Sequence, residues 1–383
     1  MEIREKMLPV LGPHGGEDEI QAVREVIESG WWGKGPKVAE FEEKFAKMVG
    51  AKYALAVTSN SHGQDLVMKA LGFKGVDVIN PTISFVATAV IPLWNDCTSN
   101  IVDVDRKNLN ITAEQVDKYK KDNSEVCIAV NMAGIPAPID EIRKVFGGFI
   151  IEDCAHSCYT DGAGQKGDVA VWSFQAVKTM PMGDGGMVTT NDKQLYEKMK
   201  EMIWFGVSST WSRVGSNTPG YAWDYEINTL GYKYYMIDLM ASIGLAQMEK
   251  LPEFLKTRRH IQDRYNKELH PLIGRPEYSD TVQYYCARFD KVITSWAPDK
   301  SGYAYVTRDT LIDYLADKNI HTSVHFKPLH KYNLLKTDRE FPVADSEWLK
   351  LISLPCHNGM TDEDIDYVLY WVNKFCEENA KSE

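Results

Sequence analysis

The stretch Phe149-Ile-Ile-Glu-Asp-Cys-Ala-His156 ends a short apolar run with two acids and an imidazole. Val169-Ala-Val-Trp-Ser-Phe-Gln-Ala-Val-Lys178 ends the next apolar run with a lysine, and Gly183-Asp-Gly-Gly186 follows as a turn. Near-continuous apolar runs of this length are typical of strands in a parallel sheet that is covered on both faces. Since ligands bind at the carboxyl ends of such strands, the polar residues that follow these runs are candidates for a site.

Apolar runs of the same kind recur through the first 200 residues. They are Tyr53–Val57, Val76–Ile79, Ile101–Val104 and Val126–Val130. Helical patterns between them supply the crossovers that parallel strands need. Two more helices are expected upstream, over Glu17–Ser29 and from Pro36 to Met48. The sequence therefore predicts an α/β fold with a doubly wound, mainly parallel sheet.

The texture of the sequence changes after Thr190. Residues 206–235 are rich in Gly, Ser, Trp and Tyr with little periodicity, which is typical of a functional loop or of one that reaches a partner subunit. Met236–Leu269 is helical in pattern, and Pro252 marks a break or a kink in it. A smaller α+β unit is expected from about residue 246, ending on a helix over Asp362–Glu377. We expect a large domain over residues 1–245 and a small C-terminal domain over residues 246–383.

Composition excludes several classes of partner. The chain has 383 residues, of which 44% are hydrophobic and 25% are charged, as in ordinary globular proteins. The net charge of −11 and the lack of a Lys/Arg run argue against binding to nucleic acid or to an anionic membrane. No apolar run is long enough to span a membrane and no signal peptide is recognised. We expect a cytoplasmic protein.

The seven cysteines agree with that location. An odd number of thiols scattered through a long chain indicates reduced cysteines. Cys154 and Cys158 are four residues apart, but no second Cys/His pair nearby completes a zinc site, so no metal is expected.

The chemistry of Asp153, Lys178 and Ser173 fits an aldehyde cofactor with a pyridine ring and a phosphate. Such a cofactor needs an amine for a Schiff base, a carboxylate for the ring nitrogen and donors for the phosphate, and pyridoxal phosphate (PLP) has all these features. Once released by a substrate amine, Lys178 can also carry protons. Taken singly, Asp153 is better explained as a helix cap, Lys178 as a surface charge and Ser173 as a strand-end serine. The combination favours the cofactor site.

Further residues are candidates for the same site, and each of them also has an ordinary structural explanation. Thr58-Ser-Asn-Ser61 lies between a strand and a helix, where backbone amides bind anions; Asn60 tolerates positive φ and can replace a glycine there. Alone, this segment indicates only a helix cap at Ser61. Phe85 is a candidate to stack on a pyridine ring, or a core phenylalanine. His156 is a candidate to bond the ring oxygen, or a structural histidine.

His325 and His330 fall in a Pro-containing loop of the second domain. Zinc would need more ligands at closer spacing. A polar contact with substrate, or a hydrogen bond that closes the domain interface, fits these two histidines better.

With these residues in hand, the chain resembles the DegT/StrS-type sugar aminotransferases, which are fold-type I PLP enzymes. The resemblance covers nearly the whole length, and seven individually weak motifs occur in the right order. They are Ser29–Glu42, Pro81–Thr88, Glu152–His156, Gly167-Asp168 with Ser173–Gly186, Gly231–Tyr234, His325–His330, and Leu354-Pro355 with Met360–Asp364. Within the family, the perosamine-synthase-like branch is the most similar.

The resemblance implies a role for each residue of the set. Lys178 forms the Schiff base, Asp153 pairs with the pyridinium, His156 reaches the ring hydroxyl, Phe85 stacks on the ring, and Ser59, Asn60, Ser61 and Ser173 hold the phosphate. Members are homodimers with shared active sites, and the segment Gly231–Tyr235 supplies the cross-subunit contact. Lys233 is then a phosphate donor, while His325, His330 and Tyr235 are implied to contact substrate.

The chain departs from the family pattern at several positions. The turn that usually reads Ser-Gly-Thr is Ser59-Asn60-Ser61, and Tyr235 stands where Asn or His is common. Asn131 and Ile135 replace a Val-His…Gly-Gln pattern and are candidates to change the accepted sugar. The loop Ser208–Glu226, with Trp211 and Trp223, offers aromatic faces to a sugar or a base, or packs in an interface.

The resemblance implies transfer of an amino group from L-glutamate to a nucleotide-linked keto sugar, commonly a 4-keto-6-deoxy hexose. A PLP-dependent sugar dehydratase is a second possibility. Lys178 argues against it, because relatives with that activity carry His at the Schiff-base position. A non-catalytic PLP-binding regulatory protein is a third, and the complete acid/base set argues against it.

Overall fold

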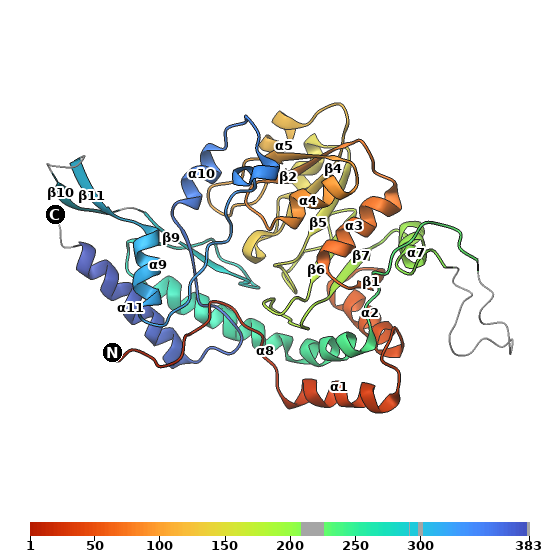
Figure 1. Cartoon of the computed structure of the whole chain (residues 1–383), viewed down its shortest axis with the longest axis horizontal. Helices are drawn as coiled ribbons and strands as arrows, with labels where there is room; N and C mark the ends of the chain where they lie inside the picture. Colours follow the sequence, from red (N-terminus) through yellow and green to blue (C-terminus); the bar gives the residue numbers. More distant parts are fainter. Residues whose placement is uncertain (208–225, 291, 298–301, 381–383) are drawn as a thin grey trace.

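The computed structural model describes residues 1–207, 226–290, 292–297 and 302–380. Trp211 and Trp223, and with them the loop from Ser208 to Tyr225 that the sequence marked as specialised, lie outside these residues. The described chain forms a sheet with covering helices in one half and a smaller mixed unit in the other, and one long helix lies along both (Figure 1).

A seven-stranded sheet organises the first half, in the order β1-β7-β6-β5-β4-β2-β3. The strands are β1 Tyr53–Val57, β2 Asp77–Pro81, β3 Thr98–Val102, β4 Ser124–Val130, β5 Phe149–Asp153, β6 Val169–Ser173 and β7 Gly186–Thr190. The five strands from β2 to β6 are parallel, and β7 is antiparallel to both of its neighbours, β6 and β1. The predicted mainly parallel α/β sheet is confirmed.

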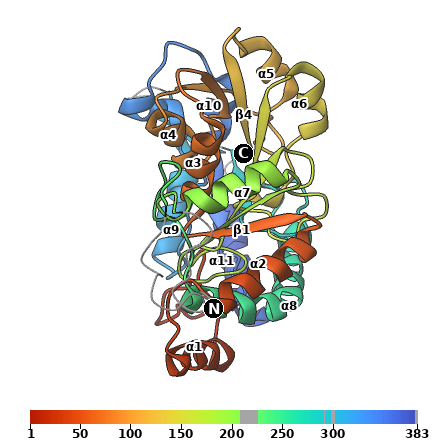
Figure 2. The same ribbon diagram turned by 90° about the vertical axis from the view of Figure 1, so that its right-hand side faces the viewer.

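Helices cover both faces of this sheet (Figure 2). They are α2 Pro36–Val49, α3 Asn60–Leu71, α4 Ala87–Trp94, α5 Ala113–Tyr119, α6 Ile139–Val145 and α7 Lys193–Met202. The first helix, α1 Glu17–Ser29, lies outside this layer (Figure 1). Successive strand residues point to opposite faces. Val169 and Val171 therefore pack with α3, while Ala170 and Trp172 pack with α2. The doubly wound layout follows from this burial on both sides.

The C-terminal half has its own small sheet and core. Its strands are β8 Ile273–Gly274, β9 Tyr285–Phe289 and β12 Leu351–Leu354, in the order β12-β9-β8, with the hairpin β10 Val292–Ala297 and β11 Gly302–Val306. Its helices are α9 Arg308–Ala316, α10 Pro342–Trp348 and α11 Asp362–Ala380. Short 3₁₀ turns lie at Leu329–Lys331 and Asn333–Leu335 in this half, and at Met132–Gly134 in the first half. Leu8, near the N-terminus, is buried in this second core, so both chain ends meet there.

The helix α8 spans Asp238–Glu268 and joins the two halves. It packs against α1 and α2 at its start, and its residues Ile261 and Tyr265 are buried in the C-terminal core. Pro252 lies inside the helix without ending it, so of the expected break or kink the break does not occur. The boundary expected after residue 245 falls inside this helix, and it stays a prediction.

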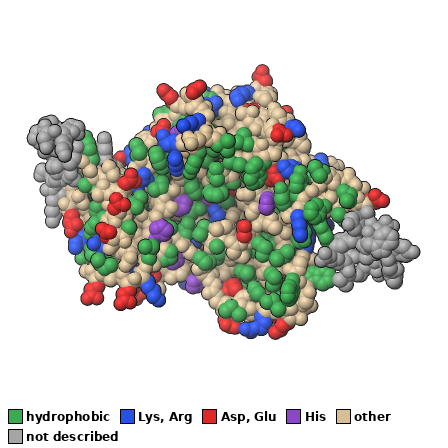
Figure 3. All heavy atoms as spheres, in the orientation of Figure 1, with side chains coloured by type: hydrophobic (Ala, Val, Ile, Leu, Met, Phe, Trp, Pro, Cys, Tyr) green, Lys and Arg blue, Asp and Glu red, His purple; other side chains and the backbone are tan. Residues whose placement is uncertain are grey.

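Hydrophobic side chains gather across the face seen in Figure 3. Several large apolar residues are exposed on the described surface, among them Ile20, Trp32, Phe205, Ile227 and Leu230.

Among the described helices, none has the length and hydropathy that crossing a membrane requires.

Candidate active site

A cavity of about 500 Å³ lies where the carboxyl ends of β5 and β6 meet the start of α3. The first half of the chain contributes Ser59, Asn60, Ser61, Phe85, Asp153, His156, Ser173 and Lys178 to its lining. The C-terminal half contributes Tyr284, His325 and Phe326. The structure thus brings together residues that are more than 250 positions apart in sequence.

Lys178 follows β6 in the loop that leads to β7, and its side chain is partly buried in the cavity. Burial lowers its pKa to about 8, because the desolvated ammonium is disfavoured, while the nearby Asp153 carboxylate opposes the fall. Its Nζ lies 5.9 Å from the centre of the Tyr284 ring. A substantial fraction of this amine is therefore neutral near physiological pH.

Asp153 ends β5, and three donors hold its carboxylate. The Ala155 backbone N–H and the Asn60 amide both donate to Oδ1 at 3.0 Å, and the Gln64 amide donates to Oδ2 at 2.9 Å. Burial raises the pKa of this carboxyl group, and the hydrogen bonds oppose the rise. The Asp153 carboxylate is therefore an oriented acceptor for a positively charged group in the cavity. Such a group would further stabilise the ionised form of Asp153.

Asn60 differs from the expectation in its backbone conformation and in the contacts of its side chain. It is the first residue of α3 and does not adopt positive φ, so it does not replace a glycine in the turn. Its side chain donates to Asp153 and to the Val171 carbonyl, so the side chain points at the carboxylate rather than at a phosphate. Gln64, one helical turn later, was missed because nothing in its sequence context marks it; only its spacing of four from Asn60 offers a signal.

The start of α3 forms one end of the cavity. Ser59, rather than Ser61, caps this helix, and its Oγ accepts from the His62 N–H at 3.1 Å. First-turn amides of a helix have no acceptor within the helix and favour an anion. Gly186 pairs with Ser173 in the sheet, and a Cβ on Gly186 would lie 2.4 Å from the Ser59 carbonyl carbon. The small residue lets the helix start sit directly beside Ser173.

Phe85 and His156 both lie in the cavity. Phe85 is 58% exposed, so it is not a core phenylalanine. His156 is buried, and its Nδ1 has no hydrogen-bond partner among the described residues. Burial holds the pKa of His156 well below its ordinary value, and Lys178 lowers it further, so the ring is neutral. A neutral imidazole with a buried unpaired nitrogen needs a polar partner in the cavity.

Of the two loop histidines, His325 lines the cavity and His330 does not. His325 stacks on Tyr284 with ring centres 3.8 Å apart and shares a hydrogen bond with the Ser353 hydroxyl. Its pKa is lowered to about 3 by burial, and then by Lys178, so it is neutral.

His330 lies outside the lining of the cavity, and its expected contact with substrate stays a prediction. Its ring nitrogens bond Thr82 and Asp345 at 2.7 and 3.2 Å, and the ring stacks on Phe341. It ties the C-terminal loop to β2, the alternative that the sequence left open. Asn131 is fully buried, bonded to Glu152 and Ser157, and is not part of the cavity lining, so its expected effect on the accepted sugar stays a prediction.

Lys233 and Tyr235 are not part of the cavity of their own chain. Lys233 is exposed and pairs with Trp204, while Tyr235 pairs with Val57 at the end of β1. Any contact they make with a cofactor or substrate would have to be in another subunit.

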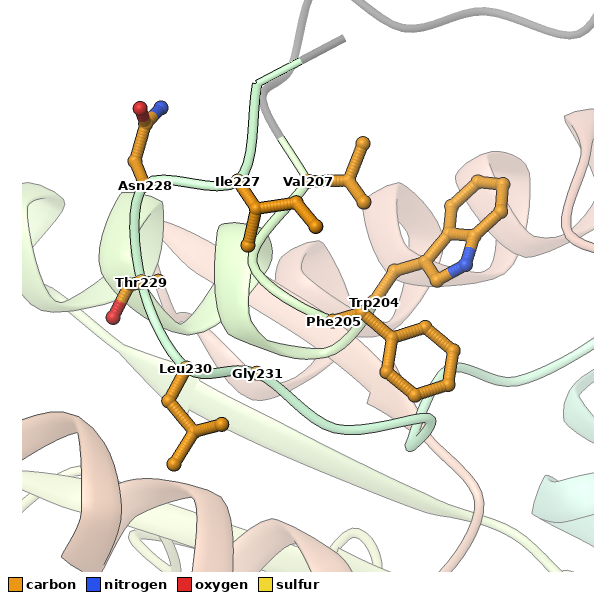
Figure 4. Close-up of a pocket in the computed structure, with 8 residues that line it drawn as sticks. All are labelled: Trp204, Phe205, Val207, Ile227, Asn228, Thr229, Leu230 and Gly231. Carbon is orange, nitrogen blue, oxygen red and sulfur yellow. The ribbon is translucent and has the colours of Figure 1, made fainter. Parts of the chain in front are cut away.

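A second hollow of about 830 Å³ lies beside the end of α7 (Figure 4). Its described lining consists of Trp204, Phe205, Val207, Ile227, Asn228, Thr229, Leu230 and Gly231. None of these side chains is ionisable, so this hollow offers no acid or base. The reactive groups lie in the first cavity, which we call the Lys178 cavity.

The described residues hold no cluster of His, Cys, Asp and Glu that could bind a metal ion. All seven cysteines are free and buried, and burial raises the pKa of Cys158 to about 12, so its thiol is protonated and inert.

Comparisons with known proteins show the family to which the chain belongs. The model of the DegT/DnrJ/EryC1/StrS aminotransferase family matches residues 13–373. The spore coat polysaccharide biosynthesis protein SpsC of Bacillus subtilis is 35% identical over 387 residues, covering 96% of both chains. The uncharacterized protein MJ1066 of Methanocaldococcus jannaschii is 34% identical, covering 98% of this chain and all of that one. The crystal structure of the aminotransferase TlmJ from Streptoalloteichus hindustanus has a TM-score of 0.86 at 29% identity, covering 97% and 99% of the two chains.

Proposed function

Because the chain belongs to the DegT/DnrJ/EryC1/StrS aminotransferase family, we propose that it uses PLP to move an amino group from L-glutamate to a nucleotide-linked keto sugar. The observation that carries this proposal is the pairing of a depressed-pKa amine, Lys178, with an oriented carboxylate, Asp153, in one cavity. A keto sugar of the 4-keto-6-deoxy hexose type is the substrate class that we favour.

The residues of the Lys178 cavity fit PLP. The lysine amine would hold the aldehyde, Asp153 the ring nitrogen, and the unpaired Nδ1 of His156 the ring hydroxyl. Phe85 offers a ring face that is not used in the core. Ser59, Ser61 and Ser173, with the first-turn amides of α3, would hold the phosphate. A cavity of about 500 Å³ is within the range that cofactor sites occupy.

When bound, the cofactor supplies a charged ring that accepts the electrons of a carbanion. Asp153 keeps its carboxylate beside the ring nitrogen and so favours the protonated ring. Lys178, whose pKa of about 8 leaves part of the amine neutral, takes a proton from the donor carbon and later returns one to the sugar carbon. His156 and His325 stay neutral, so they orient groups by hydrogen bonding without adding charge.

The sugar substrate is supported by the relatives and by the cavity. SpsC is named for spore coat polysaccharide biosynthesis and matches this chain over 96% of its length. The wall of the cavity from the C-terminal half carries Tyr284 and Phe326, and aromatic faces suit sugar rings. The particular sugar and its nucleotide are left open by these features.

We propose a homodimer with shared active sites. The described lining of the Lys178 cavity contains no Lys or Arg besides Lys178, while a phosphate dianion needs a counter-charge. Lys233 is exposed on its own chain and would supply that charge to a partner's cavity. The exposed apolar residues Phe205, Ile227 and Leu230 lie on neighbouring segments and favour burial against a second copy.

The first test is the absorbance spectrum of the purified protein with PLP, before and after adding L-glutamate. We expect a visible band that depends on Lys178, and we expect glutamate to bleach it. The keto sugar that restores the band then identifies the second substrate.

The Lys178→Ala variant is the control, because it should bind PLP without fixing it covalently and should not exchange amino groups. A wild-type band that ignores glutamate and other amino donors would point instead to a dehydratase or to a non-catalytic protein. A Lys178→Ala protein that still cycles amino groups would refute the assigned role of this lysine.

A further inference from the structure

The C-terminal half of the molecule grips the short loop that carries Lys178. Gln283, just before β9, accepts hydrogen bonds from the Thr179 N–H and the Thr179 hydroxyl, both at 3.0 Å, through its Oε1. Its Nε2 donates to the Val177 carbonyl at 2.9 Å. One carboxamide thus bonds the residues on both sides of Lys178. Gln283 and Thr179 are each 1% exposed, so water does not compete for these bonds.

A second link from the same half ends on the same loop. The Asn358 side chain donates to the Thr179 carbonyl at 2.9 Å. Arg258, on α8, donates its Nε to the Asn358 oxygen at 2.5 Å, and its Nη1 donates to the Val282 and Cys356 carbonyls at 2.9 and 3.2 Å. Arg258 is fully buried; its Nε and Nη1 are used in these bonds, while its Nη2 has no hydrogen-bond partner among the described residues.

The backbone that presents Gln283 is held in an unfavourable conformation. Val282 has φ of 46°, in the left-handed region that a β-branched residue rarely adopts. It is kept there by Arg258, which bonds its carbonyl, and by the Gln283 N–H, which donates to the Ala133 carbonyl at 3.2 Å. Such conformations persist where the surroundings over-determine them, and they concentrate at functional sites.

Within the loop, the bonds next to Lys178 lie on the side that leads in from β6, and the leading-out side is next held locally at Met182, whose N–H donates to the Phe174 carbonyl at 2.8 Å. The Lys178 N–H donates to the Gln175 carbonyl at 2.8 Å, and the Val177 N–H donates to the Gln175 side chain at 3.0 Å. The Val177 carbonyl and the polar groups of Thr179 instead meet the C-terminal half. The position of the lysine Cα therefore depends on residues more than 100 positions away.

From this geometry we propose that Gln283 is a positioning residue for the transamination reaction. It fixes the backbone on both sides of Lys178 so that the amine reaches the reacting carbon, and Asn358 with Arg258 secures the same loop from behind. The inference rests on the proposed function of Lys178. It goes further by making the C-terminal half part of the catalytic alignment, although Gln283 itself touches neither cofactor nor substrate.

The test replaces Gln283 by methionine, which keeps the shape and removes all three hydrogen bonds. Asn100→Leu is a matched control, because Asn100 is also buried and has three hydrogen bonds: its amide donates to Asp77 at 2.7 Å and to the Tyr119 carbonyl at 2.9 Å and accepts from Arg339 at 3.0 Å. It lies on the edge strand β3, outside the Lys178 cavity. Rates of the glutamate half-reaction are measured in single turnovers, with protonated and α-deuterated glutamate. Thermal stability of each protein is measured alongside.

We expect Gln283→Met to slow the half-reaction by about 10- to 100-fold, the loss typical of a misplaced reacting group. The glutamate concentration for half-maximal rate should change less than about twofold, and the deuterium isotope effect should rise, because only proton transfer is impaired. Asn100→Leu should lose similar thermal stability and keep the wild-type rate and isotope effect. Equal slowing in both variants, or a normal rate in Gln283→Met, would overturn the inference.

Thr179→Val covers the case in which Gln283→Met does not fold. It removes only the hydroxyl bond to Gln283 and keeps the backbone bond, so a smaller slowing with the same raised isotope effect is expected; an unchanged isotope effect would count against the inference. If wild type itself does not react with glutamate, the proposed function fails first. The rate at which Lys178 fixes PLP, measured by borohydride trapping, then still tests whether Gln283 positions the amine.

Discussion

At the scale of single residues, burial shifts the pKa of each ionisable group in the Lys178 cavity toward its neutral form. Burial lowers the pKa of Lys178 and of both lining histidines, and it raises the pKa of Asp153. The two groups that must exchange charge with a cofactor are thereby brought closer to neutrality in its absence. A charged ring would reverse the effect on Asp153, so binding and ionisation are coupled.

The pKa of Lys178 predicts how covalent capture of PLP depends on pH. The folded-state pKa of about 8 lies below the ordinary lysine value of about 10.4. The fraction of Lys178 in the neutral form therefore falls as the pH drops below 8 and approaches one as the pH rises above 8. We expect the rate of covalent capture by the cofactor-free protein to rise about tenfold per pH unit up to 8 and then to level off. Stopped-flow absorbance measures this rate.

Lys178→Ala supplies the background for that measurement, because its exposed lysines should capture PLP with a rate that keeps rising toward pH 10. A wild-type profile that also rises to pH 10 would show that the amine is not shifted. The same shift affects folding: the unfolded chain binds more protons between pH 8 and about 10.4, so this lysine opposes folding most below pH 8 and less as pH rises through that window.

The sequence located most cavity residues by their place after strands, but it could not assign their partners. Asp153 and Lys178 follow apolar runs, and that position alone puts them at one edge of the sheet. The hydrogen bonds that Asn60 and Gln64 donate to Asp153 could not be predicted, because they depend on how α3 packs across β6. Tyr284 and Gln283 were missed for the same reason: the two halves must dock before these side chains have neighbours.

At the scale of elements, β7 sets the geometry of the cavity end at the start of α3. It inserts antiparallel between β1 and β6 and places Gly186 under the start of α3. The sequence predicted the strands β1 to β6 from their apolar runs, with bounds that differ by a few residues. It missed β7, since the glycines before it suggested only a turn, and an antiparallel strand within a parallel sheet is fixed by its neighbours rather than by its own pattern.

The close contact of Gly186 predicts the effect of a single methyl group. Gly186→Ala would place a Cβ 2.4 Å from the Ser59 carbonyl carbon and 2.6 Å from the Asn60 nitrogen, both backbone atoms, so α3 must shift. Overpacking of this kind costs about 1–3 kcal/mol. We expect the Kd for PLP to rise at least about tenfold, as measured by equilibrium dialysis, because the shift misplaces the phosphate donors.

Gly147→Ala is the matched control for that experiment. A Cβ at Gly147 meets no atom within 4 Å, and the residue lies away from the cavity, so its Kd for PLP should equal that of wild type. If Gly186→Ala bound PLP normally, the start of α3 would not be the phosphate site.

At the scale of the whole molecule, the proposed dimer divides each active site between two chains. Lys178 and Lys233 of one chain would then serve different cavities, which makes a complementation test possible. Mixed dimers of Lys178→Ala and Lys233→Ala chains contain one site with both lysines intact and one with neither. Each variant alone should be nearly inactive, whereas the purified mixed dimer should recover about half of the wild-type activity.

Differently tagged chains, co-expressed and purified on both tags, provide the mixed dimer, and sedimentation establishes its mass. The double variant Lys178→Ala/Lys233→Ala, paired with wild type, is the control: if the sites are shared, each of its two sites lacks one lysine and this dimer should be nearly inactive, whereas sites formed within single chains would leave about half of the wild-type activity. A mixed dimer no more active than its parents would place Lys233 outside the shared site, and an active monomer would exclude the dimer altogether.

The position of β1 at the edge of the sheet bears on how the chain is made. Its strand neighbour β7 lies about 130 residues further on, so at ribosomal rates of about 5–20 residues per second the apolar segment Tyr53–Val57 waits roughly 7 to 26 seconds for its pairing. The parallel strands β2 to β6 leave the ribosome in the meantime and have no such delay in finding one another. During synthesis, the segment Tyr53–Val57 is thus a natural target for chaperones, and a truncated chain that stops before Gly186 would leave it open to aggregation.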